Sequence, residues 1–541
     1  MDLFPAYRPT VPGMQQSLVE RFGDLPQVMD DATSLTFRDV DRQSAILARG
    51  LLARGLGKGA RVGLLLPNGP EWATAWFAIT RMGAIAVQLS TFGAARELAH
   101  VIRHADVQLL ITADRFLSHD YLERLPTALP GLADSEGGRP LQLRAAPFLR
   151  EIWVFGEAPA WARGDRAGLE AAAADISSET LSAVEAEVHP SDAAVMIYTS
   201  GSTSDPKAVV HSHGVVTRHS HVMSRYMTYG RGDRLLSVSP MFWVGGLCTS
   251  MLAANQSGAA CVTPRTQSPA DVVRTIRGCQ VTHAFLAAPK ARALYGVDGF
   301  DEAELRRLKP STATQQFVYG LTPKELTPDS LGMSETFGPH SMEFAGERLP
   351  PDKTGSFGRG VRRVERKIIR AETGEELPAG ELGELCVRGY SLMDGYYKRE
   401  RAESFDSDGW FHTGDLCSIS EDGYLFFHGR SGEMLKTSGA NVSPREVELV
   451  LLEYPDIADA AVVGLPHPKM GQMVVAAVVL RPGRVMDEGK LRGWLQGQLS
   501  SFKVPKRFVP MDASEIPRTD TGKIRKAELQ ARLEQLAGEA S

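Results

Sequence analysis

A run of small polar residues that ends in a lysine lies near the middle of the chain. Residues 198–207 read YTSGSTSDPK and directly follow the strand-like segment 193–197. Hydroxyl groups and backbone N–H groups placed after a strand can donate hydrogen bonds to phosphate oxygens, and a lysine adds positive charge. We therefore interpret the segment as a phosphate loop, although an ordinary polar turn has the same composition.

Two known loops of similar sequence do not fit this segment. The P-loop pattern GxxxxGK[ST], counted from Gly201, requires glycine at position 206 and serine or threonine at position 208. The chain has Pro206 and Ala208 at these positions. Residues 204–207 match the SxxK pattern of penicillin-binding proteins, but the SDN partner of that pattern does not occur.

Neither a metal site nor a disulfide framework is supported. Four histidines lie close together in the sequence, at His211, His213, His219 and His221. No HExxH spacing or cysteine partner accompanies them, so we interpret them as structural or surface residues. The cysteines are odd in number and lack CxxC spacing: Cys248, Cys261, Cys279, Cys386 and Cys417.

The elements that must position these groups alternate between helix and strand. Between residues 39 and 91, helix-like stretches alternate with the short apolar runs RVGLLLPN and GAIAVQLS. This alternation is typical of a doubly wound, mostly parallel sheet, so the predicted fold class is α/β. After residue 443 a capping box, SPRE, predicts a helix, which is followed by two apolar strands at 460–465 and 473–480. These segments predict a small α+β domain at the C-terminus.

Length and composition limit the class of protein. The 541 residues suggest three to four folding units, and 43% hydrophobic with 23% charged residues is ordinary for a globular chain. A net charge of -5 gives no attraction to nucleic acid. No signal sequence and no membrane span is recognised, so we expect a cytoplasmic protein, with homo-oligomerisation left open.

A series of motifs gives these residues a shared context. The phosphate loop resembles YTSG[ST]TGxPKG, and LGMSETFG at 331–338 resembles YGxTE. GELCVRG at 383–389 precedes GYY, GWFHTGD spans 409–415, GRSGEMLKTSGANVSPREVE spans 429–448, and PRTDTGKIRK spans 517–526. In this order the motifs resemble those of the adenylate-forming superfamily, which includes acyl-CoA synthetases, firefly luciferase and the adenylation domains of peptide synthetases. The resemblance covers nearly the whole chain.

The resemblance implies two domains and one reaction type. A large N-terminal domain of doubly wound mixed sheets and helices (1–430) would bind AMP, and a small mobile α+β domain (431–541) would carry the catalytic lysine. Gly432 would lie at the hinge, where a missing Cβ permits rotation. ATP, with Mg²⁺, would convert a carboxylic acid to an acyl-adenylate, and a thiol such as that of coenzyme A would then take the acyl group.

The resemblance also assigns roles to individual residues. Lys523, Lys207 and Glu335 would be catalytic, with Glu335 as the Mg²⁺ ligand. The predicted ATP- and AMP-binding set is Thr199, Ser200, Gly201, Ser202, Thr203, Lys207, Gly332, Ser334, Asp415, Arg430 and Lys523. Weaker matches predict coenzyme A contacts at Lys436, Ser438 and Gly439. The adenine loop expected before the YGxTE motif is missing, and residues 317–323 are expected to take its place.

The acyl pocket is predicted from residues 240–246, PMFWVGG, which resemble PLFHxxG. Phe242 and Trp243 would supply an apolar wall, and Gly245 and Gly246 would leave room beside it. We therefore expect an acid–thiol ligase for an apolar acid, such as a medium- or long-chain fatty acid or a steroid-like acid. An aryl-CoA ligase, an enzyme that loads a carrier protein, luciferase-like oxidation and a non-catalytic nucleotide or acyl sensor remain alternatives.

Overall fold

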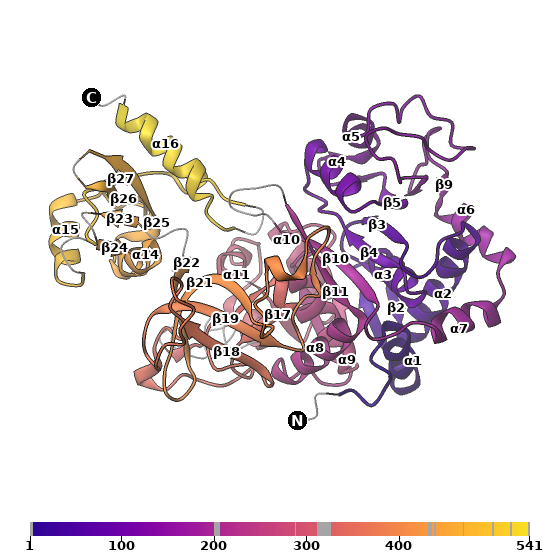
Figure 1. Cartoon of the computed structure of the whole chain (residues 1–541), viewed down its shortest axis with the longest axis horizontal. Coiled ribbons are helices and arrows are strands. Elements are labelled where there is room, and N and C mark those ends of the chain that lie inside the picture. Colours follow the sequence, from indigo (N-terminus) through magenta and orange to yellow (C-terminus); the bar gives the residue numbers. More distant parts are fainter. Residues whose placement is uncertain are drawn as a thin grey trace. The chain divides into compact units, whose positions relative to one another are not determined.

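The chain folds as two compact units (Figure 1). One comprises Met1–Glu365 and Arg388–Phe411, and the other Arg366–Val387 and His412–Ser541. The structure is a computed structural model and describes residues 4–199, 206–286, 288–310, 326–430, 435–437, 440–468, 470–499, 503–519 and 522–538. The predicted domain boundary, after residue 430, falls inside the second of these units. That the segment after residue 430 moves as a domain stays a prediction.

The first unit contains an eight-stranded sheet that is parallel except at one end. Its order is β20 (Gly395–Tyr396), β11 (Lys207–Ser212), β10 (Ala193–Thr199), β4 (Ile85–Gln88), β3 (Arg61–Leu65), β5 (Leu109–Ala113), β8 (Glu151–Phe155) and β9 (Gly164–Asp165). Strands β4, β5 and β8 are buried along their whole length, as expected for strands covered on both faces. Antiparallel pairing occurs at this one end, between β10 and β11 and between β11 and β20.

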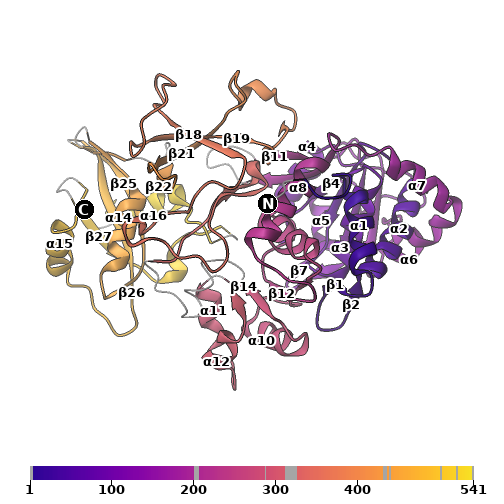
Figure 2. The same ribbon diagram turned by 90° about the horizontal axis from the view of Figure 1, so that it is seen from below.

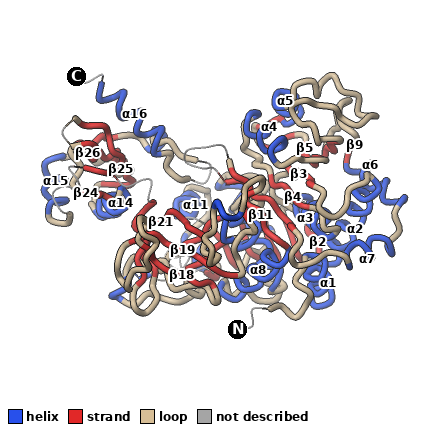
Figure 3. The backbone as a smooth tube through the Cα atoms, viewed as in Figure 1, coloured by secondary structure: helices blue, strands red, loops and turns tan. Residues whose placement is uncertain are grey.

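Helices lie on both sides of this sheet. Figure 3 shows α4 (Ala95–His104) and α5 (Tyr121–Ala128) on one side of β3 and β5, and α2 (Phe37–Ala53) and α3 (Pro70–Arg81) on the other. Helices α6 (Arg166–Ala171) and α7 (Ser178–Ala186) and the short β6 (Arg115–Phe116) and β7 (His119–Asp120) complete this region. The strand–helix alternation predicted from residues 39–91 is thus confirmed.

A second sheet of the same unit is also mostly parallel. Its order is β15 (Lys309–Pro310), β14 (His283–Phe285), β12 (Arg234–Ser237), β13 (Ala260–Val262), β1 (Pro26–Met29) and β2 (Ser34–Thr36). Helices α10 (Pro269–Gly278), α11 (Ala288–Leu294) and α12 (Glu302–Arg306) gather beside β12 and β14 (Figure 2) and share an apolar core with them. The remaining helices are α1 (Val11–Phe22), α8 (His213–Tyr226), a π-helix (Gly245–Leu252) and α9 (Ala253–Gln256).

The second unit holds two sheets. One has the order β18 (Val364–Ile369), β19 (Gly383–Gly389), β21 (Phe411–Ile419) and β22 (Leu425–Arg430). The other has the order β24 (Ala440–Val442), β23 (Leu435–Thr437), β26 (Gly471–Leu480) and β25 (Ile457–His467), with β27 (Arg507–Pro510) also paired to β26. Its helices are α14 (Pro444–Glu453), α15 (Glu488–Gln496) and α16 (Lys526–Gly538).

The C-terminal α+β prediction is confirmed in detail. Ser443 is the N-cap of α14 and accepts a hydrogen bond from the Glu446 N–H at 3.3 Å, with Pro444 at the first helical position. The two predicted strands lie within β25 and β26. Helices α14 and α15 share one apolar cluster with this sheet and α16 shares another, so the sheet is covered on both faces.

Neither a membrane-spanning helix nor a disulfide bond is found among the described residues. No helix among them is long and apolar enough to cross a bilayer. All five cysteines are free and buried.

His213 links the start of α8 to the start of α1. The Val11 N–H donates to His213 Nδ1 at 3.2 Å, so this nitrogen carries no proton. Burial lowers the pKa of His213 to about 4, with smaller effects from Asp192, which raises it, and Lys58, which lowers it. The folded ring is therefore neutral down to a pH well below 6.5, where a histidine of the unfolded chain takes up its proton.

We predict that His213 makes the first unit sensitive to acid. Between about pH 6.5 and 4 only the unfolded state binds the extra proton. The free energy of unfolding therefore decreases as the pH decreases, by at most about 1.4 kcal/mol per pH unit for this group. His213→Asn retains an acceptor oxygen but does not titrate, so its Tm should fall less between pH 7 and pH 5 than that of the wild type. His189→Asn, at an exposed histidine, is the control and should leave the wild-type slope. Equal slopes for His213→Asn and wild type would contradict the prediction.

Candidate active site

The predicted phosphate loop connects two strands that pair in register. Thr199, the last residue of β10, lies opposite Lys207, the first residue of β11. The loop therefore begins at the carboxyl end of a parallel strand, where ligands bind in open α/β sheets, and returns to the same sheet edge. Ser200, Gly201, Ser202 and Thr203 lie outside the described residues.

Two histidines of α4 bind the two ends of this loop. His100 Nε2 donates to the carbonyl of Pro206 at 3.3 Å, and His104 Nδ1 forms a 2.8 Å hydrogen bond with the Tyr198 hydroxyl. Their rings stack, with centroids 5.4 Å apart. Burial, followed by the charge of His100, lowers the pKa of His104. The i, i+4 spacing of the two histidines was the available sequence signal, and it was not used.

Ser334, Glu335 and Thr336 form a tight 3₁₀ turn, called here the SET turn, between β16 (Leu331–Met333) and β17 (Gly338–Ser341). His211 Nε2 donates to the Ser334 carbonyl at 2.6 Å, and the Met393 N–H donates to the Glu335 carbonyl at 2.8 Å. Gly332 has no room for a side chain, because a Cβ there would lie 2.4 Å from the Gly338 carbonyl oxygen. The turn is thus fixed to the strand that carries Lys207.

Glu335 and Lys207 meet at one tyrosine. The Tyr396 hydroxyl donates to Glu335 Oε1 at 2.7 Å, and Lys207 Nζ lies 5.0 Å from the centroid of the Tyr396 ring. Tyr396 lies on β20, opposite Val209 of β11. The structure therefore brings together two of the three residues predicted to be catalytic, through a residue that the sequence analysis recognised only as part of the GYY motif.

Three of the four clustered histidines, His211, His213 and His219, are buried. Burial lowers the pKa of His211 to about 4 and that of His219 to about 3, and His219 Nδ1 lies 3.2 Å from the Tyr390 hydroxyl. Among the described residues, no group of three or more histidine, cysteine or acidic side chains is arranged to hold a metal ion. His211 has a further part, because it fixes the SET turn.

Asp415 and Arg430 are neighbours on adjacent strands of the second unit's first sheet. They are directly opposite in the antiparallel pairing of β21 and β22, and Arg430 Nε lies 3.0 Å from Asp415 Oδ1. Asp415 is buried, whereas the Arg430 side chain is about half exposed. This cross-strand pair places a buried carboxylate and a more exposed guanidinium side by side.

Lys523 lies in an exposed turn before α16. The Lys523 N–H donates to Thr519 Oγ1 at 3.1 Å, and the Thr519 N–H donates to the Lys523 carbonyl at 2.8 Å. Gly522 has a φ of 82°, a value that favours glycine. The backbones of Thr519 and Lys523 are thus held together, while the Lys523 side chain faces solvent.

Several predicted positions cannot be placed. Gly432, Ser438, Gly439 and residues 317–323 lie outside the described residues. Lys436 is on β23, opposite Asn441, and only its backbone is described.

The segment 240–246 is fixed by an asparagine from the other sheet. Asn68, after β3, donates to the Ser239 carbonyl at 2.8 Å and accepts from the Met241 N–H at 2.7 Å. Phe242 is buried and packs edge-on against Trp243 and Phe92, at centroid distances of 5.0 and 6.0 Å. The amide of Asn68 therefore holds the start of the predicted acyl segment through two backbone groups, one just before it and one inside it.

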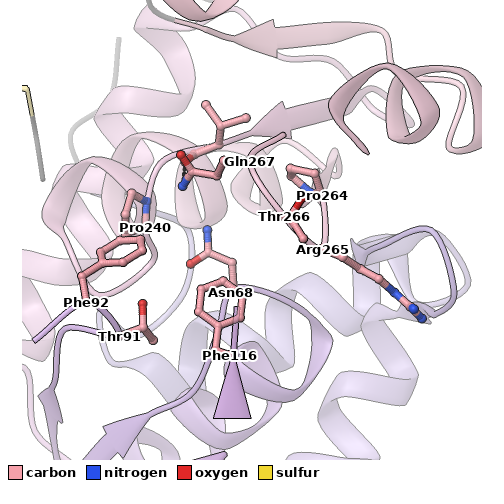
Figure 4. Close-up of a pocket in the computed structure, with 10 residues that line it drawn as sticks. Asn68, Thr91, Phe92, Phe116, Pro240, Pro264, Arg265, Thr266 and Gln267 are labelled. Carbon is pink, nitrogen blue, oxygen red and sulfur yellow. Dashed lines mark hydrogen bonds between the residues drawn. The ribbon is translucent and has the colours of Figure 1, made fainter. Parts of the chain in front are cut away.

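A small cavity lies next to this segment (Figure 4). Figure 4 shows Asn68 between Phe116 and Gln267, with Phe92 and Pro240 to one side. Its volume of about 20 Å³ is enough for about one water molecule. An acyl chain would have to displace side chains to use it.

The two glycines of the segment differ. A Cβ on Gly246 would lie 2.1 Å from the Pro240 carbonyl oxygen, whereas a Cβ on Gly245 would meet nothing within 4 Å. Gly246 is therefore required by close packing, and only Gly245 leaves open space. The π-helix that starts at Gly245 was not predicted, and such helices are frequent at functional sites.

The chain is similar to known proteins over nearly its whole length. The AMP-binding enzyme family matches residues 16–397, and the AMP-binding enzyme C-terminal domain matches residues 446–523. Acyl-CoA ligase SID4 of Ajellomyces capsulatus is 31% identical, over 96% of this chain and 90% of the relative. 4-Coumarate–CoA ligase 5 of Oryza sativa subsp. japonica is 30% identical, over 94% of this chain and 91% of the relative.

The fold has a counterpart among solved structures. ATP-bound MatB from Rhodopseudomonas palustris superposes with a TM-score of 0.79 at 23% identity, covering 97% of this chain and 99% of that chain. The family match covers most of this chain, and the two relatives align over nearly their full length. The chain belongs to the AMP-binding enzyme family and is an ATP-dependent, AMP-forming ligase that joins a carboxylic acid to coenzyme A.

Proposed function

We propose that this ligase activates an apolar carboxylic acid, with medium- or long-chain fatty acids and bulky alicyclic acids as its preferred substrates. The observation that supports this proposal is the apolar wall of Phe242, Trp243 and Phe92 beside the open space at Gly245. Each methylene buried against such a wall contributes about 0.8 kcal/mol, so a short acid loses several such contributions.

The first step joins two anions. A carboxylate oxygen attacks the α-phosphorus of ATP, the bond to the bridging oxygen breaks, and pyrophosphate leaves. Catalysis of such a step consists mainly of positioning and charge neutralisation. We assign the β- and γ-phosphates to the loop at Thr199–Thr203 and to Lys207, and the α-phosphate to the neighbourhood of Ser334.

The residues present fit a magnesium ion carried by the nucleotide. Glu335 Oε1 accepts from Tyr396, and no hydrogen bond of Oε2 is found in the described structure, so one hard oxygen is available. Glu335 would hold the ion together with phosphate oxygens. When bound, Mg²⁺ would neutralise part of the negative charge of the phosphates.

The second unit would supply the remaining nucleotide contacts. Asp415 would accept hydrogen bonds from the ribose hydroxyls, and Arg430, its cross-strand partner, would join it. Lys523 would bind both the substrate carboxylate and the α-phosphate. In the second step the thiol sulfur of coenzyme A attacks the acyl carbon and loses its proton, and AMP leaves; Lys436, Ser438 and Gly439 are the proposed contacts of coenzyme A.

An aryl acid is the second candidate. The 30% identical rice relative is named a 4-coumarate–CoA ligase, and a flat ring could also pack against Phe242 and Trp243. A carrier protein as the acyl acceptor would show as acyl-AMP formation without thioester in the presence of coenzyme A. A non-catalytic sensor would bind nucleotide but release no pyrophosphate.

The substrate proposal is tested by a panel of acids. We predict that kcat/KM for pyrophosphate release is higher with octanoate, palmitate or a bile-acid-like carboxylate than with acetate or benzoate. Gly245→Val should selectively lower activity on the bulky acids, because its side chain occupies the open space. Gly246→Ala is the contrasting variant and should lower Tm, because its Cβ has no room. Acetate or benzoate preferred by tenfold or more would refute the proposed substrate.

We predict that Lys523→Ala loses roughly 10²–10³-fold in adenylation rate, the effect of removing one preorganised charge donor. Thioester formation from supplied acyl-AMP should be retained. Lys490→Ala, at another exposed lysine of the same unit, should behave as wild type. Wild-type pyrophosphate–ATP exchange in Lys523→Ala would remove this lysine from the first step.

We also predict that Gly432→Pro impairs thioester formation more than adenylation. The two half-reactions need different positions of the segment after residue 430, and proline fixes φ where glycine does not. Separate assays of pyrophosphate release and of thioester formation from acyl-AMP check this. Equal loss of both activities in a folded variant would argue against a hinge at this position.

A further inference from the structure

Tyr396 occupies a special place between the two opposite charges of the phosphate site. It lies opposite Val209 on β11, and Lys207 is two residues earlier on the same strand, so both side chains are on one face of the sheet. Diagonal neighbours of this kind are within reach of aromatic and long side chains. This explains why Lys207 Nζ lies over the Tyr396 ring, 5.0 Å from its centroid.

The main chain brings Glu335 to the other end of the same ring. The Met393 N–H binds the Glu335 carbonyl at 2.8 Å, and Tyr396 follows Met393 by three residues. The Tyr396 hydroxyl then donates to Glu335 Oε1 at 2.7 Å. One side chain thus binds the cation with its ring face and the anion with its hydroxyl.

No direct ion pair forms between the described side chains of Lys207 and Glu335. Such a pair would neutralise the two groups that the phosphates and the magnesium ion need, and it would have to break each time the nucleotide binds. Tyr396 offers each charge a weaker, reversible partner instead.

We propose that Tyr396 is a positioning residue that keeps Lys207 and Glu335 apart and oriented for the magnesium complex of ATP. The hydroxyl fixes one oxygen of Glu335 and leaves the other for the ion, and the ring keeps the lysine ammonium over the site. This inference rests on the proposed roles of Lys207 and Glu335 in nucleotide binding.

The neighbouring tyrosine provides a matched control. The Tyr397 hydroxyl donates to Asp106 Oδ2 at 2.9 Å, and Lys398 forms an ion pair with the same carboxylate at 2.8 Å. Tyr397→Phe therefore removes one tyrosine–carboxylate hydrogen bond from the same segment without touching Glu335.

The experiment measures binding of α,β-methylene-ATP by calorimetry, with Mg²⁺ and with EDTA. Tyr396→Phe should weaken binding with Mg²⁺ by roughly tenfold to a hundredfold, the effect of one hydrogen bond to a charged group, and leave binding in EDTA unchanged. Tyr396→Leu, which also lacks the ring, should weaken binding in EDTA by roughly threefold to tenfold. Tyr397→Phe should match the wild type in both conditions.

The role through Glu335 is tested in a second background. In Glu335→Gln protein, the further change Tyr396→Phe should have little effect on binding with Mg²⁺, because the carboxylate that it orients is gone. Two results would overturn the role of Tyr396: equal effects of Tyr396→Phe in both backgrounds, or binding by Tyr396→Phe that matches the wild type. In either case the proposed function stands if the wild type binds the magnesium complex and releases pyrophosphate. A wild type that does neither would overturn the proposed function as well.

Discussion

The pairing of β11 with β10 is the constraint on which the rest of the phosphate site depends. It is the point where a parallel sheet gains an antiparallel strand, and it sets Thr199 opposite Lys207. The loop between them therefore starts and ends at the carboxyl edge of the parallel strands. The same strand carries His211, which holds the SET turn, and Val209, which pairs with Tyr396. A single strand pairing thus determines the place of the lysine, the glutamate and the residue between them.

The sequence was sufficient for the parts of the molecule that depend on local pattern. The apolar runs predicted β3 and β4, and the capping box at Ser443 predicted the first residue of α14. It was not sufficient for contacts between segments far apart in the chain. Nothing near Tyr396 in the sequence indicates that it binds Glu335, and nothing near Asn68 indicates that it holds residues 239–241. Such partners are selected by the sheet register and the chain crossings, which no local pattern encodes.

The predicted acyl segment shows how one motif can combine two physical roles. At Gly246 a side chain has no room because a carbonyl oxygen lies against the position of its Cβ, whereas at Gly245 nothing lies near that position. A sequence alone presents both as the same letter. Only the position of the Pro240 carbonyl, fixed by the turn that Asn68 binds, separates a packing requirement from available space. The polar amide of Asn68 therefore influences the shape of an apolar surface.

The π-helix at Gly245–Leu252 has a consequence for how this family member can change over evolutionary time. Each i→i+5 hydrogen bond closes a backbone loop that is one residue longer than the loop closed by the i→i+4 bond of an α-helix. A slip of one residue toward the α-helical pattern would rotate every later side chain by about 100° and so change which side chains face each neighbouring element. In the proposed acyl pocket, the range of acids accepted would then shift with this register, without any exchange of the aromatic residues that precede the helix.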